Sequence, residues 1–211
     1  MPPERRRLPM FPLQTVLFPH TSLPLHVFEP RYRALVADCL AGDRELGIVL
    51  ISRGSEVGGG DQRVGVGTLA RIELASPLPD GRWSLLVSGI GRLRVVEWLA
   101  EEPYPLAEVL ELPVRPDGVP SESAVAAATA AVRRTRALLS ETGRAPALGS
   151  ETELDPDPEV AAWQVCALSP VTPFDAQRLL EIEGHEARLA EVTELSVALA
   201  HDVARLLAEG G

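Results

Sequence analysis

Prolines divide the stretch from residue 8 to residue 36, and they constrain the fold more than any other feature of the chain. The first four are Pro9, Pro12, Pro19 and Pro24. They exclude a continuous helix here, because proline has no N–H to donate and its ring clashes with the preceding turn. The apolar residues between them are typical of strands: Leu13, Val16, Leu17, Phe18, Leu23, Leu25, Val27 and Phe28.

The pattern becomes helical at residue 30. Pro30 suits the first turn of a helix, where a backbone N–H has no partner to lose. The apolar residues that follow are spaced as on one helical face: Tyr32, Leu35, Val36 and Leu40. Gly42 is well placed to end this helix, which is predicted for residues 30–41.

This stretch closely resembles the opening of the Lon protease N-terminal domain, the substrate-binding region of that family. The matching residues are Met10-Phe11-Pro12-Leu13, Val16-Leu17-Phe18-Pro19, Leu23-Pro24-Leu25, Phe28-Glu29 and Arg31-Tyr32. His20 departs from the family pattern, which has glycine at this position. The resemblance implies a PUA-like β-barrel of about six strands with a helix, followed by a helical bundle.

Residue patterns beyond the first helix predict further strands. The continuous apolar run at 46–52 is typical of a strand buried on both faces. Residues 64–75 alternate, which predicts a half-buried strand with these residues on one face: Val64, Val66, Thr68, Ala70, Ile72 and Leu74. Pro79-Asp80-Gly81 predicts a hairpin turn. The strands expected after it are 83–88, then 92–99 beyond a bend at Gly89 and Gly91, and 104–112.

The composition changes at residues 113–120, which carry three prolines and a glycine, and the chain is helical in pattern from Ser121 onward. A long last helix, about 186–208, carries one apolar seam: Leu189, Val192, Leu195, Leu199, Val203 and Leu206. We therefore predict an α+β protein with three parts. They are a disordered tail at 1–7, a β-rich subdomain at 8–116 and a helical subdomain at 117–211.

Charge and composition exclude several function classes. The formal net charge of −10 disfavours nucleic-acid binding, because phosphates are repelled. The sequence contains no lysine, so Schiff-base, serine–lysine and phosphate-loop lysine mechanisms are excluded. No apolar run is long enough to cross a bilayer and no signal peptide is evident, so we expect no membrane partner and a cytoplasmic location.

The sequence predicts no catalytic residue, metal ligand or cofactor. Cys39 and Cys166 lie in apolar patterns typical of buried thiols, and no histidine has ligand-like spacing to either. The paired carboxylates Asp155 and Asp157 are most simply solvated charges. The resemblance implies the substrate-recognition part of Lon without its ATPase and peptidase modules.

The candidate site is Phe28, Glu29, Arg31 and Tyr32, for which two interpretations stay open. In the first, Glu29 accepts hydrogen bonds from backbone N–H groups at the helix start and Arg31 pairs with it. In the second, the four residues line a peptide-binding groove. The resemblance favours a non-catalytic module that binds apolar segments of unfolded or partly folded polypeptides, along a sheet edge or between the two substructures.

Two alternative functions accompany this hypothesis, and its protein partners stay open. The protein could be a hydrolase associated with peptidases, although a likeness of fold alone does not establish activity. It could be a PUA-like RNA or nucleotide binder that uses Arg71, Arg92 and Arg94. It could also work with a separate protease or form a weak homodimer.

Overall fold

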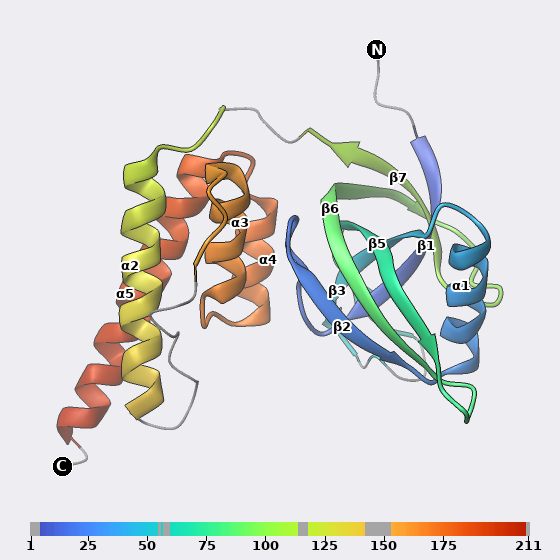
Figure 1. Ribbon diagram of the computed structural model, residues 1–211, viewed down its shortest axis with the longest axis horizontal. Coiled ribbons are helices and arrows are strands. Elements are labelled where there is room, and N and C mark those ends of the chain that lie inside the picture. Colours follow the sequence, from blue (N-terminus) through green and yellow to red (C-terminus); the bar gives the residue numbers. More distant parts are fainter. Residues whose placement is uncertain (1–4, 55, 57–59, 114–117, 142–152, 210–211) are drawn as a thin grey trace. The chain divides into compact units, whose positions relative to one another are not determined.

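The computed structural model describes residues 5–54, 56, 60–113, 118–141 and 153–209. The chain divides into two compact units, Met1–Val114 and Arg115–Gly211. All of the strands lie in the first unit and helices α2 to α5 in the second, so the prediction of an α+β protein is confirmed (Figure 1). The boundary predicted at residues 116 and 117 falls within 114–117, outside the described residues.

In the first unit, the described residues form seven strands and one helix. They are β1 Arg5–Leu13, β2 Ser22–Val27, α1 Pro30–Ala41, β3 Glu45–Arg53, β4 Gln62–Arg63, β5 Val66–Pro77, β6 Trp83–Trp98 and β7 Leu106–Leu112. The sheet order is β1-β7-β6-β5-β3-β4, and β1 also pairs with β3, so five strands close into a ring. Closure removes the exposed edges of those strands. The predicted β-barrel with one helix is confirmed (Figure 1).

Two clusters of buried side chains hold this unit together. One draws on all five ring strands and therefore fills the barrel: Leu8, Met10, Val49, Leu69, Leu93, Ala107 and Val109. Gly47 makes room for it, because a Cβ at this position would lie 2.5 Å from the sulfur of Met10. The second cluster joins α1 and β2 to the opposite faces of β1, β3, β5 and β6.

Residues 5–7 are part of β1, so the prediction of a disordered tail is wrong for them; residues 1–4 lie outside the described residues. Strand pairing with β7 begins at Arg5. The guanidinium of Arg6 lies 2.7 Å from Glu45 and 2.9 Å from Glu111. Residues 5–7 are therefore held by backbone hydrogen bonds to β7 and by these ion pairs, although three consecutive arginines are typical of a solvated segment.

Two strand predictions fail at β-bulges. Thr68, Ala70 and Ile72 are buried as the alternation requires, but Leu74 is 62% exposed. The register of β5 against β6 shifts between Ile72 and Leu74, and such a shift turns the next side chain to the other face. The strands predicted at 83–88 and 92–99 are one continuous strand, because the bend between them is a bulge inside β6.

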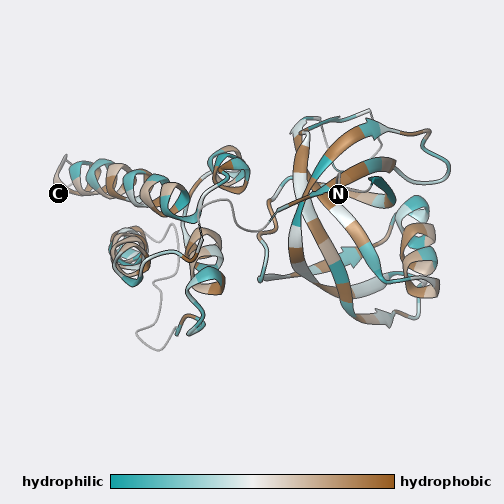
Figure 2. Cartoon of the chain, turned by 90° about the horizontal axis from the view of Figure 1, so that it is seen from above, coloured by the Kyte–Doolittle hydropathy of each residue, from teal (hydrophilic) through white to brown (hydrophobic). Residues whose placement is uncertain are grey.

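The second unit contains four helices: α2 Glu122–Glu141, α3 Pro158–Leu168, α4 Pro173–Glu181 and α5 His185–Glu209. The long last helix is confirmed, and hydrophilic and hydrophobic residues alternate around it (Figure 2). Its seam is buried at Leu189, Val192 and Val203, whereas Leu206 is 49% exposed. Among the described residues, no helix is both long and apolar enough to pass through a lipid bilayer.

The helical unit contains a buried arginine that the sequence pattern does not predict. Arg188 is 1% exposed. Its guanidinium donates to the main-chain carbonyls of Leu179, at 2.8 Å, and of Ile182. It also lies 3.8 Å from the centre of the Trp163 ring, in cation–π geometry. Arg188 therefore links α5 to α4 and α3.

Candidate functional site

Three of the four predicted site residues meet at one pocket in the β-rich unit. Phe28, Glu29 and Tyr32 line a cavity of about 160 Å³. The remaining lining comes from residues 11–13 of β1, residues 24–27 of β2 and Glu56. The strand–helix transition at residues 28–32 therefore places an aromatic ring, a carboxylate and a phenol around one concave surface.

The floor of this pocket is an aromatic stack. Tyr32 is 4% exposed, and its ring centre lies 4.3 Å from that of Phe11, with 23° between the ring planes. The guanidinium of Arg31 lies 4.5 Å from the centre of the Tyr32 ring. Burial raises the pKa of Tyr32 to about 12, so the phenol is neutral at physiological pH.

The rim of the pocket carries an exposed aromatic side chain. Phe28 directly follows β2 and is 54% exposed, although the pocket beside it is mainly apolar. An exposed large apolar side chain beside a concave apolar surface is typical of an interaction site. Phe28 is therefore available to a ligand without any rearrangement of the core.

Arg31, the fourth residue of the predicted site, is not among the residues that line this pocket. Its guanidinium lies 3.2 Å from the carboxylate of Glu29 and 3.9 Å from that of Glu101. The predicted pairing of Arg31 with Glu29 is present, but Glu29 accepts no side-chain capping bond from the start of α1. The carboxylate accepts a hydrogen bond from the Arg31 guanidinium instead.

A second arginine extends this charged cluster beyond what the sequence predicted. Arg63 lies 2.5 Å from Asp61 and 2.6 Å from Glu101, and its guanidinium lies 4.7 Å from the centre of the Trp98 ring. Burial is the largest influence on Asp61 and opposes its ionisation. The hydrogen bond from Arg63, a backbone hydrogen bond and the positive charges of Arg63 and Arg31 together outweigh burial, so the pKa of this carboxyl is lowered. The only signal for this pair in the sequence is the close spacing of Asp61 and Arg63.

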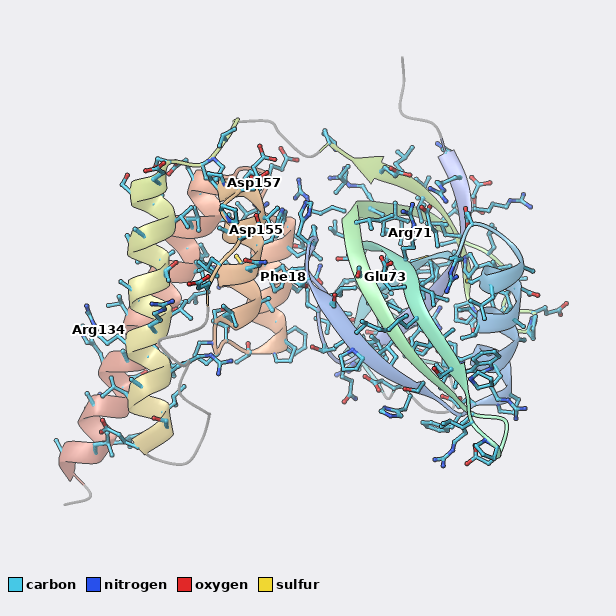
Figure 3. All side chains as sticks on the ribbon, in the orientation of Figure 1. Phe18, Arg71, Glu73, Arg134, Asp155 and Asp157 are labelled. Atoms are coloured by element: carbon cyan, nitrogen blue, oxygen red, sulfur yellow. The ribbon has the colours of Figure 1, made fainter. Side chains whose placement is uncertain are left out.

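The described residues offer little reactive chemistry. Burial raises the pKa of both Cys39 and Cys166 to about 12, so neither thiol ionises appreciably at neutral pH. Asp157 accepts a hydrogen bond from the backbone of Glu159 at the start of α3, and Asp155 accepts one from the backbone of Asp157 (Figure 3). These two carboxylates, expected to be solvated charges, order the start of a helix.

A larger cavity, of about 540 Å³, lies in the helical unit. Its walls are one side of α2 and residues 154–161, with several alanines and prolines among them. None of the predicted site residues lines it. The two cavities therefore belong to different units and are distinguishable by mutation.

Comparisons with known proteins identify relatives of this chain. Residues 7–197 match the family model for the ATP-dependent protease La (LON) substrate-binding domain. Lon protease 2 of Herpetosiphon aurantiacus is 32% identical over 200 residues, which is 93% of this chain and 24% of that protein. The chain spans about a quarter of the length of the curated relatives that it matches.

Solved structures support the same assignment and confirm the fold expected from the resemblance. The crystal structure of a Lon N-terminal domain protein from Xanthomonas campestris has a TM-score of 0.65 and 27% identity, and the match covers 89% of this chain and 96% of that one. The N-terminal domain of Mycobacterium avium complex Lon protease shares the fold, with a TM-score of 0.60, 18% identity and coverage of 90% and 98%. The chain belongs to the Lon substrate-binding domain family.

Proposed function

We propose that this chain is a non-catalytic module that binds apolar segments of unfolded or partly folded polypeptides in the pocket beside Phe28. The observation that carries the proposal is the meeting of Phe28, Glu29 and Tyr32 at one apolar concave surface, in a chain of the Lon substrate-binding family. Presentation of such segments to a separate protease belongs to the same proposal.

The pocket suits a short part of an extended chain. Its volume of about 160 Å³ resembles the apolar cavity of about 150 Å³ that holds one benzene molecule in another protein. One large side chain of a client therefore fits. Affinity is expected to be weak, because an unfolded segment loses conformational entropy when it is ordered.

Proteolysis belongs to the named relatives, of which this chain covers about a quarter. Within the chain, the sequence has no lysine and both thiols are held un-ionised by burial. We therefore expect purified protein to leave unfolded casein intact in the absence of ATP. Cleavage that disappeared after a single substitution would overturn the non-catalytic part of the proposal.

The arginines considered for nucleic-acid binding do not form a free basic patch. Arg92 is 5% exposed. Arg71 lies 2.6 Å from the carboxylate of Glu45, on a strand that also carries Glu73 (Figure 3). With a net charge of −10, this arrangement favours a polypeptide over a phosphate-bearing ligand.

The test is fluorescence anisotropy with a labelled, permanently unfolded protein, with and without ATP. We expect saturable binding that ATP does not change. Phe28→Ala should weaken binding about tenfold, since burying an aromatic ring contributes roughly 1.5–3 kcal/mol and Phe28 is already half-covered. Phe174→Ala is the matched control, because Phe174 is 59% exposed on α4 and outside the pocket. Equal effects of the two substitutions would contradict the proposed location.

A further inference from the structure

One edge of β2 is unpaired within the described part of the chain. β2 pairs with β6, from Ser22 opposite Ser88 to Val27 opposite Trp83. Just before this ladder, the N–H of Gly89 donates to the carbonyl of Thr21 at 2.9 Å. Bonded and non-bonded residues alternate in an antiparallel pair, so the main-chain groups of Pro24 and His26 point away from β6.

This edge borders the pocket. Residues 24–27 of β2 line it on one side and residues 11–13 of β1 on the other. β1 pairs with β7 only through Arg5–Pro9, so residues 11–13 have β3 alone as a paired neighbour. A short extended segment could therefore add to β2 through the carbonyl of Pro24 and both main-chain groups of His26. Pro24 has no N–H, so the addition is limited to a few residues.

The charge around the pocket is negative. Glu29 and Glu56 line it, and the lining contains no arginine. Glu29 is paired with Arg31, while the carboxylate of Glu56 accepts the backbone N–H of Gln14. In the wider cluster, the carboxylates of Glu29, Glu56, Asp61 and Glu101 outnumber the guanidiniums of Arg31 and Arg63. A ligand with a positive charge is complementary to this surface.

We propose that the groove selects extended segments in which a large apolar residue lies two positions from a lysine or arginine. The apolar side chain fills the pocket over Tyr32, and the cation lies beside Glu29 and Glu56. In an extended chain, residues i and i+2 point to the same side and lie about 7 Å apart, so both side chains reach the same groove. This inference rests on the proposed function, and it adds a charge preference to it.

Labelled peptides of one length test this preference. They carry a central phenylalanine that is flanked, two positions away on each side, by lysine, by serine or by glutamate. A fourth peptide has lysine at these positions and glycine in place of phenylalanine. At low salt, the lysine-flanked peptide should bind about three- to tenfold more tightly than the serine-flanked one, as expected for partly exposed ion pairs. The difference should disappear near 1 M salt, where the Debye length is about 3 Å. The fourth peptide, which lacks phenylalanine, should bind more weakly than the lysine-flanked and serine-flanked peptides.

Matched variants assign the effect to residues. Glu56→Gln should remove most of the preference for lysine, whereas Glu73→Gln, a change at an exposed carboxylate outside the pocket, should leave it unchanged. If all flanked peptides bind equally, the charge inference is overturned while the proposed function stands. If none of the phenylalanine peptides binds, the proposed function fails and the inference fails with it.

Chemical coupling gives a second readout that does not depend on affinity differences. A carbodiimide joins a carboxylate to a lysine amine with loss of water. Because the chain has no lysine, its only own amine is the N-terminus, and nearly every coupled product reports a peptide contact. Mass spectrometry should find the lysine-flanked peptide on Glu29 or Glu56. Coupling confined to the helical unit, for example at Glu122 of the larger cavity, would refute the assigned groove.

Discussion

Gly89→Ala should destabilise the β-rich unit, because this glycine lies where two segments of backbone cross. An added Cβ would lie 2.3 Å from the carbonyl oxygen of Phe18 and 3.1 Å from the Cα of Pro19 (Figure 3 labels Phe18). These are main-chain atoms, so they cannot rotate away as a flexible side chain would. The same crossing contains two hydrogen bonds, His20 N–H to the Gly89 carbonyl at 2.8 Å and Gly89 N–H to the Thr21 carbonyl at 2.9 Å.

The magnitude follows from these contacts. Overpacking of this kind costs about 1–3 kcal/mol. Each weakened hydrogen bond adds about 0.5–1.5 kcal/mol. With both hydrogen bonds weakened, we therefore expect Gly89→Ala to lower the free energy of unfolding by about 2–6 kcal/mol. The crossing also sets the start of β2, so the pocket beside that strand should lose affinity for its ligand.

Gly91→Ala is the matched control, two residues further along the same strand. A Cβ at Gly91 would have no neighbour within 4 Å. Its effect on unfolding free energy should be below about 1 kcal/mol, since alanine mainly restricts the unfolded chain. Hydrogen exchange in peptides from β5 and β6, measured as urea is increased, reports the unfolding free energy of this unit alone. Equal stability of the two variants would refute the argument from the crossing.

Three further predictions concern stability and reactivity. Arg188→Met should lower the free energy of unfolding of the helical unit by about 2–4 kcal/mol, measured by urea unfolding, because two main-chain carbonyls lose their donor. Arg205→Met is the control: this side chain is 68% exposed, so the change should be less than about 0.5 kcal/mol. Cys39 and Cys166 should react slowly with a thiol reagent at pH 8 and rapidly in denaturant, since burial raises the pKa of both to about 12; fast labelling of native protein would contradict this. The pKa of Asp61 in the folded protein lies below its ordinary 3.8, so the unfolded state takes up the proton first as the pH falls. The stability that this carboxylate provides above about pH 4 is therefore lost at lower pH. Asp61→Asn should make the urea midpoint depend less steeply on pH in the acidic range, and an unchanged dependence would argue against the ion pair.

Local signals in the sequence predicted local structure well. At the start of α4, Thr172 accepts the backbone N–H of Asp175 and Pro173 is the first helical residue, an arrangement typical of helix starts. The helix at 30–41 has the predicted bounds, because proline and glycine act within a few residues of their own position. The barrel as a whole followed from the resemblance of residues 8–36, not from periodicity.

Features that depend on long-range register could not be predicted in this way. Leu74 fits the alternating pattern, yet the bulge that exposes it is set by pairing with β6. Arg188 looks like a surface residue in sequence, because its partners are main-chain carbonyls of another helix. Arg63 and Glu101 are far apart in the chain, and only the folded barrel brings their charges together.

The same limit applied to the candidate site. Phe28, Glu29 and Tyr32 were predicted because they cluster in sequence at a strand–helix transition. Glu56 and residues 11–13 were missed, since they reach the pocket only through strand pairing and the loop after β3. Arg31 is adjacent to these residues in sequence, and its guanidinium lies beside the carboxylates of Glu29 and Glu101.

Hydrogen–deuterium exchange of the chain, with and without a saturating, permanently unfolded client, tests the central claim most directly. The account predicts slower exchange in peptides that contain residues 11–13 and 22–32 when the client is bound, because these residues line the pocket and its strand edge. Saturable binding that slows exchange only in α2 and residues 154–161 would contradict it, and would place the client in the cavity of the helical unit.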